Sequence, residues 1–228
     1  MLRIVAATRL DPLSFDRHTL LGRSVRQFLV PDEVCVDVAY ANTRGLSEVF
    51  NAGLERASAH DVIVFTHDDV RINDWFLRER LREALERFAV VGVAGNRRRV
   101  PRQPAWAHLD PQTLDDRANL SGAVAHFCDG LHEGLRDEIR FFGEVPAAVK
   151  LLDGVLLAST VGTLRDAGIR FDPQFRYEFY DLDFCRSCER AGLTMGTWPI
   201  AITHASGGKF GSAEWRDAYA RYLAKWKD

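Results

Sequence analysis

The sequence lacks the long apolar runs and the charge imbalance that mark several protein classes. No stretch of its 228 residues approaches the roughly 18 consecutive apolar residues of a membrane-spanning helix. The apolar run near the N-terminus, residues 1–7, is too short for a signal peptide. The net charge is only −2, so no global field favours nucleic acid or an anionic membrane. We therefore expect a soluble, cytoplasmic protein that does not bind nucleic acid.

Cysteine is also scarce, and its spacing admits two interpretations. Cys185 and Cys188 have the C-x-x-C spacing of a redox pair or of half a zinc site, beside Cys35 and Cys128 elsewhere. No second C-x-x-C and no nearby histidine pair completes a zinc set. The segment around the pair has helical spacing, so buried thiols on one helix face are the favoured interpretation.

The glycine motifs that cradle phosphates are missing. The chain contains neither G-x-G-x-x-G nor G-x-x-x-x-G-K-[ST], so dinucleotide and P-loop binding are both unsupported. What is present is an alternation of strand and helix patterns, with strands expected at residues 3–7, 33–38, 62–65 and 90–95 and helices at 42–57 and 75–88. This order predicts an α/β fold of doubly wound type, with a mostly parallel mixed sheet flanked by helices.

The rest of the chain offers no linker that would divide it, so we expect a single domain over residues 1–228. Residues 1–95 look like a nucleotide-binding half of doubly wound type, and residues 96–212 form the other half, with strands expected at 123–128 and 147–157. Residues 213–228 form a C-terminal helix with four aromatic residues at helical spacing, namely Trp215, Tyr219, Tyr222 and Trp226. Docking on the domain is the default for such a helix. A peripheral membrane contact, at the inner membrane face, is the alternative.

One candidate site follows the strand at residues 62–65. The apolar run ends in His67, Asp68 and Asp69, and ligands of open α/β sheets lie beyond the carboxyl ends of strands. Two adjacent carboxylates repel each other unless donors or a cation compensate, and Mg²⁺ or Mn²⁺ prefers oxygen ligands. A solvated turn after the strand is the competing interpretation.

A second acidic cluster opens the helix expected near residue 181. Asp181 and Asp183 lie beside Tyr177, Phe179 and Tyr180. Carboxylates in a first helical turn are stabilised by the macrodipole, so one of the two can be a cap alone. Beside aromatic residues, an ionised carboxylate also suits a general base next to a sugar.

Four sequence blocks resemble the family 2 type glycosyltransferases of the GT-A fold, and more narrowly their bacterial glycosyltransferase-like branch. The resemblance runs over residues 34–208. Its blocks are Asp37 with residues 42–54, residues 64–70 at the metal-binding D-x-D position, residues 152–158, and residues 171–208 containing Tyr180-Asp181 and His204. Two departures stand out: the D-x-D position carries His-Asp-Asp, and the E-D motif carries Tyr180 before Asp181.

The resemblance implies that residues 96–212 are the acceptor-binding half, and it implies roles for particular residues. Asp181 is implied as the catalytic base, and Asp69 with His204 as ligands of the divalent cation. The nucleotide-sugar contacts are implied at Thr8, Arg9, Asp37, Asn51 and Asp68. Lys209 and the run Arg97–Arg99 are spare cations that can steady a diphosphate, although solvated side chains explain them as well. Trp106, Asp153 and Tyr177 are candidate acceptor contacts, because aromatic rings stack on sugars.

These roles add up to a metal-dependent, inverting glycosyltransferase. It would move a sugar from a nucleoside-diphosphate sugar to a hydroxyl of a glycan, a lipid-linked molecule or another acceptor, with Mn²⁺ or Mg²⁺ as its cation. Two alternatives remain open at this point. One is a non-catalytic module of the same fold that binds a nucleotide sugar or glycan; the other is a metal-dependent sugar-nucleotide hydrolase that uses Asp68 and Asp69.

Overall fold

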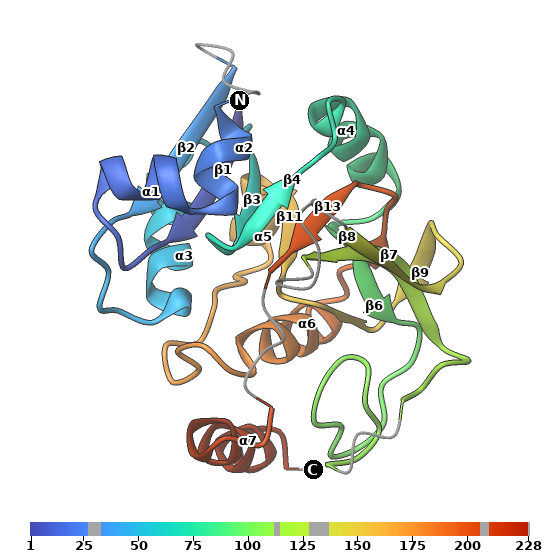
Figure 1. Cartoon of the computed structure of the whole chain (residues 1–228). Coiled ribbons are helices and arrows are strands. Elements are labelled where there is room, and N and C mark those ends of the chain that lie inside the picture. The colour runs from blue at the N-terminus through green and yellow to red at the C-terminus, as the bar shows by residue number, and fades with distance from the viewer. Residues whose placement is uncertain (27–32, 112–114, 128–136, 206–209, 228) are drawn as a thin grey trace.

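The computed structural model describes residues 1–26, 33–111, 115–127, 137–205 and 210–227, and Figure 1 shows how their elements are arranged. The helices are α1 (Pro12–His18), α2 (Leu20–Val25), α3 (Leu46–Arg56), α4 (Leu77–Arg87), α5 (Val161–Asp166), α6 (Tyr180–Arg190) and α7 (Ala213–Trp226). The strands are β1 (Leu2–Ala7), β2 (Val34–Ala39), β3 (Val62–Thr66), β4 (Val70–Ile72), β5 (Val90–Gly92), β6 (Ala94–Asn96), β7 (Leu120–Phe127), β8 (Asp137–Gly143), β9 (Ala147–Val149), β10 (Leu151–Leu152), β11 (Leu156–Thr160), β12 (Met195–Thr197) and β13 (Ile202–His204).

A seven-stranded sheet forms the centre, in the order β2-β1-β3-β11-β5-β12-β9. Strand β1 is parallel to β2 and β3, and β12 is parallel to β5. The remaining pairs, β3–β11, β11–β5 and β12–β9, are antiparallel. The predicted α/β fold with a mixed sheet flanked by helices is confirmed. Parallel pairing dominates only among the first three strands, because β11 returns between β3 and β5 without a crossover helix.

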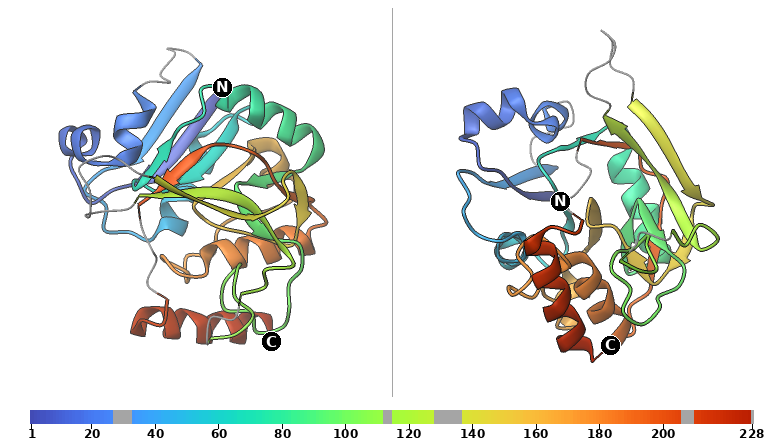
Figure 2. Two further views of the ribbon diagram at one scale, coloured as in Figure 1. Left: turned by 45° about the vertical axis from the view of Figure 1, so that its right-hand side comes forward. Right: turned by 60° about the horizontal axis from the view of Figure 1, so that its bottom comes forward.

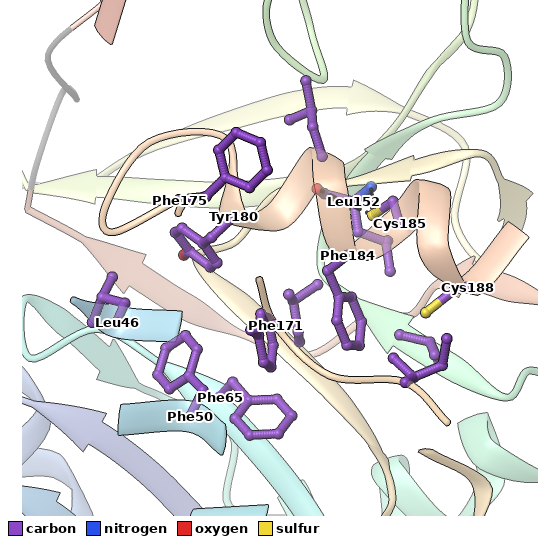
Figure 3. Close-up of a cluster of buried hydrophobic side chains, with 14 of the residues drawn as sticks. Leu46, Phe50, Phe65, Leu152, Phe171, Phe175, Tyr180, Phe184, Cys185 and Cys188 are labelled. Carbon is purple, nitrogen blue, oxygen red and sulfur yellow. Dashed lines mark hydrogen bonds between the residues drawn. The ribbon is translucent and has the colours of Figure 1, made fainter. Parts of the chain in front are cut away.

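The sheet buries both faces, as its sequence pattern requires. Along β1, Val5 and Ala7 face α3, α5 and α6, while Ile4 and Ala6 face α1, α2 and α4. Successive side chains of a strand point to opposite faces, so these apolar residues serve two cores. Figure 3 shows the first core, where Phe50 of α3 and Phe65 of β3 meet Phe171 and Tyr180. This core holds the N-terminal end of α6 against the sheet.

Two predicted strands are divided in the structure. The expected strand at residues 90–95 breaks at Val93 into β5 and β6, and these belong to different sheets. Strand β6 joins a second sheet, in the order β10-β6-β7-β13-β4, with β8 paired to β7. The expected strand at residues 147–157 is likewise divided into β9, β10 and the start of β11. Hydrophobic periodicity could not reveal where these strands divide, because apolar residues are buried on both sides of each break.

The C-terminal helix α7 docks on the domain through its aromatic face. Trp215, Ala218 and Tyr222 are buried. Lys225 donates to Asp183 Oδ2 and Trp226 Nε1 donates to Asp183 Oδ1, each over 2.9 Å. Figure 2 shows α7 alongside α6. The helix therefore docks on the domain as predicted, and its aromatic residues contact the rest of the protein. Among the described residues, no helix is long and apolar enough to cross a membrane.

The cysteines of the C-x-x-C pair are free thiols on α6. Cys185 and Cys188 are buried among the core residues of Figure 3. Leu152 N donates to Cys185 Sγ over 3.2 Å. Both thiols therefore pack as the sequence analysis favoured, and burial raises the pKa of Cys188 to about 12.

Candidate active site

The turn between β3 and β4 carries His67, Asp68 and Asp69, and a distant strand brings His204 beside it. Strand β13 pairs with β4 so that His204 lies opposite Val70. The backbone N–H of Ala205 then donates to the carbonyl of Asp69 over 3.0 Å. This pairing fixes two of the predicted site residues, Asp69 and His204, next to each other.

Three side chains converge there with the geometry of a cation site. Asp69 Oδ1 lies 3.4 Å from His204 Nε2 and 3.9 Å from His67 Nδ1. One ligand atom from each of the three residues falls within 4.8 Å of the other two. Ligands that bind a metal at about 2.1 Å lie roughly 3–4 Å apart, so these spacings fit one shared ion.

Two of those ligand atoms have no other partner. Asp69 Oδ1 and His204 Nε2 are buried, and within the described part of the chain neither makes a hydrogen bond. A buried polar atom without a partner is costly, and a cation between the two would satisfy both. The donor set of one carboxylate and two imidazoles suits a divalent transition metal such as Mn²⁺ better than Mg²⁺, which prefers oxygen ligands. The residues present therefore fit the predicted divalent cation.

His67 is the ligand that the sequence analysis did not assign. It occupies the first position of the His-Asp-Asp stretch, ahead of the two carboxylates where the cation was expected. Imidazole is a common metal ligand, and this histidine stands directly beside the two carboxylates in the sequence. That adjacency was the available signal.

The protonation states of Asp69 and His67 favour cation binding. Burial lowers the pKa of His67 to about 4, although the Asp69 carboxylate opposes this shift. Burial raises the pKa of Asp69, but His204 and His67 outweigh it and the net shift is downward. Burial likewise opposes the charge on His204, yet the Asp69 carboxylate raises the pKa of that imidazole overall. At neutral pH Asp69 is therefore ionised and His67 is neutral, which are the forms that ligate metals.

Asp181 lies at the start of α6 and faces the same region. Its Oδ2 accepts from Gly154 N over 3.1 Å, and its Oδ1 accepts from Leu182 N over 2.8 Å. Burial, together with the nearby Asp153 carboxylate, raises the pKa of Asp181 to about 7, although the two backbone donors oppose the shift. A carboxyl that titrates near neutral pH is well matched to proton transfer.

Asp153 stands beside Asp181 in a similar environment. Burial raises the pKa of Asp153, and His204 and a hydrogen bond with the Trp106 side chain partly oppose the shift. Two neighbouring carboxyls of this kind titrate as a pair, each making ionisation of the other harder.

A cavity of about 640 Å³ joins these groups. Its lining includes four of the residues predicted from the sequence, Asp153, Asp181, His204 and Trp106. Aromatic rings of Phe142, Phe179, Phe210 and Trp215 contribute further wall. His204 of the cation cluster and the carboxyl pair thus border one space large enough for a small ligand.

Asp68 is not part of the cation cluster and contacts the residues that follow β1. Burial raises the pKa of Asp68, and a hydrogen bond from the Thr8 side chain and the charge of Arg9 partly oppose the shift. Thr8, Arg9 and Asp68 are therefore neighbours at the carboxyl ends of β1 and β3. This is the edge of the sheet where ligands of open α/β folds bind.

Other predicted donor and acceptor residues lie elsewhere, and their roles stay predictions. Asp37 forms a bidentate pair with Arg56 and also lies 3.8 Å from Arg3. The Asn51 amide both donates to and accepts from the backbone of Phe171. Tyr177 is exposed, and its hydroxyl donates to Arg44 O over 2.8 Å. Lys209 lies outside the described residues.

Asp183 and the arginine run have structural partners. Asp183 is buried and holds Lys225 and Trp226 of α7, so of the two acids in the first turn of α6 only Asp181 faces the cavity. The three arginines are each paired with an acidic side chain: Arg97 with Glu144, Arg98 with Asp116 and Arg99 with Glu189.

Comparisons with known proteins identify the family and the fold. The sequence model described as "Glycosyltransferase like family" matches residues 21–204. No curated protein matches the chain. The crystal structure of residues 1–349 of S. aureus TarS is 12% identical, with a TM-score of 0.52, over 98% of this chain and 64% of that one. The structure of GalNAc-T7 with UDP, GalNAc and Mn²⁺ is 14% identical, with a TM-score of 0.53, over 100% of this chain and 50% of that one.

These likenesses show that the chain has the GT-A fold. The chain spans less than two thirds of the length of either of these two proteins.

Proposed function

The chain belongs to the glycosyltransferase-like family, and we propose that it is a metal-dependent, inverting glycosyltransferase. It would move a sugar from a nucleoside-diphosphate sugar to an acceptor hydroxyl, in the synthesis of a polysaccharide or glycoconjugate. The observation that carries the proposal is that His204, a member of the cluster with His67 and Asp69, lines the same cavity as Asp181. GalNAc-T7, which has the same fold, was solved with a nucleotide, a sugar and Mn²⁺.

The cation cluster would serve the donor. Asp69, His204 and His67 would hold a divalent cation, whose positive charge would stabilise the leaving diphosphate. Asp69 is ionised at neutral pH and offers an anionic ligand, whereas the raised pKa of His204 means that a cation would compete with a proton there. Thr8, Arg9 and Asp68 line the adjacent strand ends and would contact the nucleoside. Asp37 would contact the nucleotide sugar only if it released Arg56. Asn51 would do so only if its amide released the backbone of Phe171.

Asp181 would serve the acceptor. An alcohol attacks poorly until its proton is removed, and Asp181 borders the cavity with a pKa near the working pH. Attack from the side of Asp181, opposite the leaving diphosphate, inverts the anomeric carbon. Trp106 and Asp153 line the same cavity and would hold the acceptor, a glycan, a lipid-linked molecule or another alcohol.

A membrane contact through α7 would have to use the outward face of that helix. Trp215 and Tyr222 are buried against the domain, and Trp226 bonds Asp183. The proposal of a lipid-linked acceptor therefore does not require this helix to insert into a bilayer.

A thermal-shift screen tests the proposal directly. The protein is heated with UDP-, GDP- and dTDP-sugars, in the presence of Mn²⁺, Mg²⁺ or EDTA. We expect one nucleotide class to raise the melting temperature only when a divalent cation is present. A chain that no cation–nucleotide pair stabilises would contradict the proposal.

A transfer assay with Asp181→Asn then separates enzyme from binding module. This variant is expected to bind the donor normally and to lose transfer by roughly 10²–10⁴-fold, the usual contribution of a general base. Donor binding by the wild type without transfer to any alcohol would support the binding module instead. Release of free sugar without an acceptor would support the hydrolase.

A further inference from the structure

Tyr180 occupies the position where the E-D motif of similar sequences has glutamate, and its hydroxyl meets the cation cluster. The hydroxyl lies 2.6 Å from His67 Nε2 and donates to the carbonyl of Gly154 over 2.9 Å. Its ring is buried between Phe50 and Phe171, with centroid distances of 5.8 and 6.1 Å. Figure 3 shows Tyr180 within this aromatic cluster. The two ring contacts and the hydrogen bond to Gly154 therefore hold the hydroxyl in one place.

These two contacts determine which nitrogen of His67 carries the proton. A carbonyl oxygen only accepts, so the single proton of Tyr180 points to Gly154. The tyrosine oxygen must then accept from His67, which places the proton on Nε2. The other nitrogen, Nδ1, lies 3.9 Å from Asp69 Oδ1, which is too long for a hydrogen bond. Nδ1 consequently keeps its lone pair and directs it at the cluster.

Gly154 connects this chain of contacts to Asp181. Its carbonyl receives the Tyr180 proton, and its N–H donates to Asp181 Oδ2 over 3.1 Å. A Cβ atom at this position would lie 2.2 Å from the Tyr180 oxygen and 3.0 Å from the Asp181 Cβ. Only glycine leaves room for both side chains.

We propose that Tyr180 is a positioning residue that fixes His67 with Nδ1 free to ligate the divalent cation. The inference rests on the cation site of the proposed function. Partners in the outer shell of a metal commonly set the tautomer of a ligating histidine and raise metal affinity by about 10–100-fold. Gly154 makes the same tyrosine part of the frame that holds Asp181, so the cation and the base keep a fixed separation.

Mn²⁺ binding to the full chain, measured without nucleotide by titrating the free-ion EPR signal, tests the proposal. Tyr180→Phe keeps the buried ring and removes the hydroxyl, and we expect Mn²⁺ affinity to fall by about 10–100-fold. Tyr177→Phe is the matched control, because it removes a hydroxyl that also donates to a backbone carbonyl, that of Arg44. Its Mn²⁺ affinity should equal that of the wild type. Equal affinity in Tyr180→Phe would overturn the proposal.

A second experiment replaces the ligand. His67→Asn offers a carbonyl near the position of Nδ1 and nothing near Nε2. In this background Tyr180→Phe should change Mn²⁺ affinity no further, since the two residues act through one bond. An undiminished effect of Tyr180→Phe in that background would refute the route through His67.

The tautomer can also be observed without metal or activity. In ¹⁵N spectra of the metal-free wild-type protein, His67 is expected to carry its proton on Nε2, and Tyr180→Phe is expected to lose that preference. A proton on Nδ1 of the wild type would overturn the proposal. If instead the wild type binds neither Mn²⁺ nor Mg²⁺ while His67 shows the expected tautomer, the proposed function fails and the Tyr180–His67 contact stands.

Discussion

The carboxylate of Asp69 and the imidazole of His204 face each other across 3.4 Å, although they come from opposite ends of the domain's sequence. Pairing of β13 with β4 creates this contact, and neither facing atom has a hydrogen-bond partner in the part of the chain that the structure describes. A binding site held by strand pairing is preorganised, so an ion can occupy it without large rearrangement.

Asp69→Asn is expected to abolish stabilisation by cations. A ligand at 100 times its dissociation constant stabilises a protein by about 2.7 kcal/mol, and this shift should disappear when the anionic ligand is removed. The measurement is the unfolding midpoint with and without Mn²⁺. Asp217→Asn, at an exposed acid on α7 paired with Arg221, is the control and should keep the full shift. A full Mn²⁺ shift in Asp69→Asn would exclude Asp69 as a ligand.

Asp153→Asn is expected to move the pH profile of transfer. Asp181 must be ionised to accept a proton, so activity should fall as pH drops through about 7. The Asp153 carboxylate is one cause of that raised pKa, and its removal should shift the acid limb to lower pH. The profile of kcat/KM against pH measures the shift. An unchanged or upward-shifted acid limb would show that Asp153 does not act on the base.

Asp181→Asn should stabilise the metal-free protein at alkaline pH. The folded pKa of about 7 lies above the ordinary value of 3.8, so the wild type loses stability as pH rises between these values. Asparagine never ionises and escapes this loss. The expected gain is on the order of 2 kcal/mol at pH 8, discounted for the open cavity, and near zero at pH 4. Urea unfolding in EDTA at both values checks it, and a gain that does not depend on pH would contradict the assignment.

Asp183→Asn should destabilise the fold without touching the cavity. The buried carboxylate accepts from Lys225 and Trp226, and weakening charge-assisted bonds of this kind costs about 1.5–3 kcal/mol. Asp172→Asn is the comparison, because Asp172 also pairs with Lys225 but is more exposed. Its cost should be smaller, as measured by urea unfolding. If the order of the two variants is reversed, α7 is held chiefly through Asp172.

The sequence predicted the parts of the molecule that depend on local pattern. The apolar run before His67, the acids opening α6 and the aromatic stripe of α7 are each visible within a few residues. Predicted helices at 42–57 and 75–88 begin later, at Leu46 and Leu77, because Gly45 and Phe76 take extended or turn conformations that precede the first helical turn.

Features that depend on long-range pairing escaped the sequence. His67 becomes a candidate ligand only because β13 brings His204 to Asp69, and Tyr180 becomes its partner only because Gly154 fixes the hydroxyl. Asp37 and Asn51 look available in the sequence, whereas tertiary contacts engage them with Arg56 and Phe171. The roles of Asp37 and Asn51 came from the family resemblance. No local sequence signal could show that Arg56 and Phe171 occupy the polar atoms that a nucleotide sugar would need.

The turn that leads into α6 depends on the end of the chain. Phe179 adopts a left-handed conformation with φ 64°, which is unfavourable for a bulky residue. Its ring lies 5.2–5.4 Å from the rings of Trp215, Tyr219 and Tyr222, and these contacts hold it there. In a chain shortened before Ser212, these contacts would be lost and the turn at Phe179 would relax. Asp181 would then move relative to the cation ligands. The last helix thus stabilises the position of a proposed catalytic carboxylate that it does not contact.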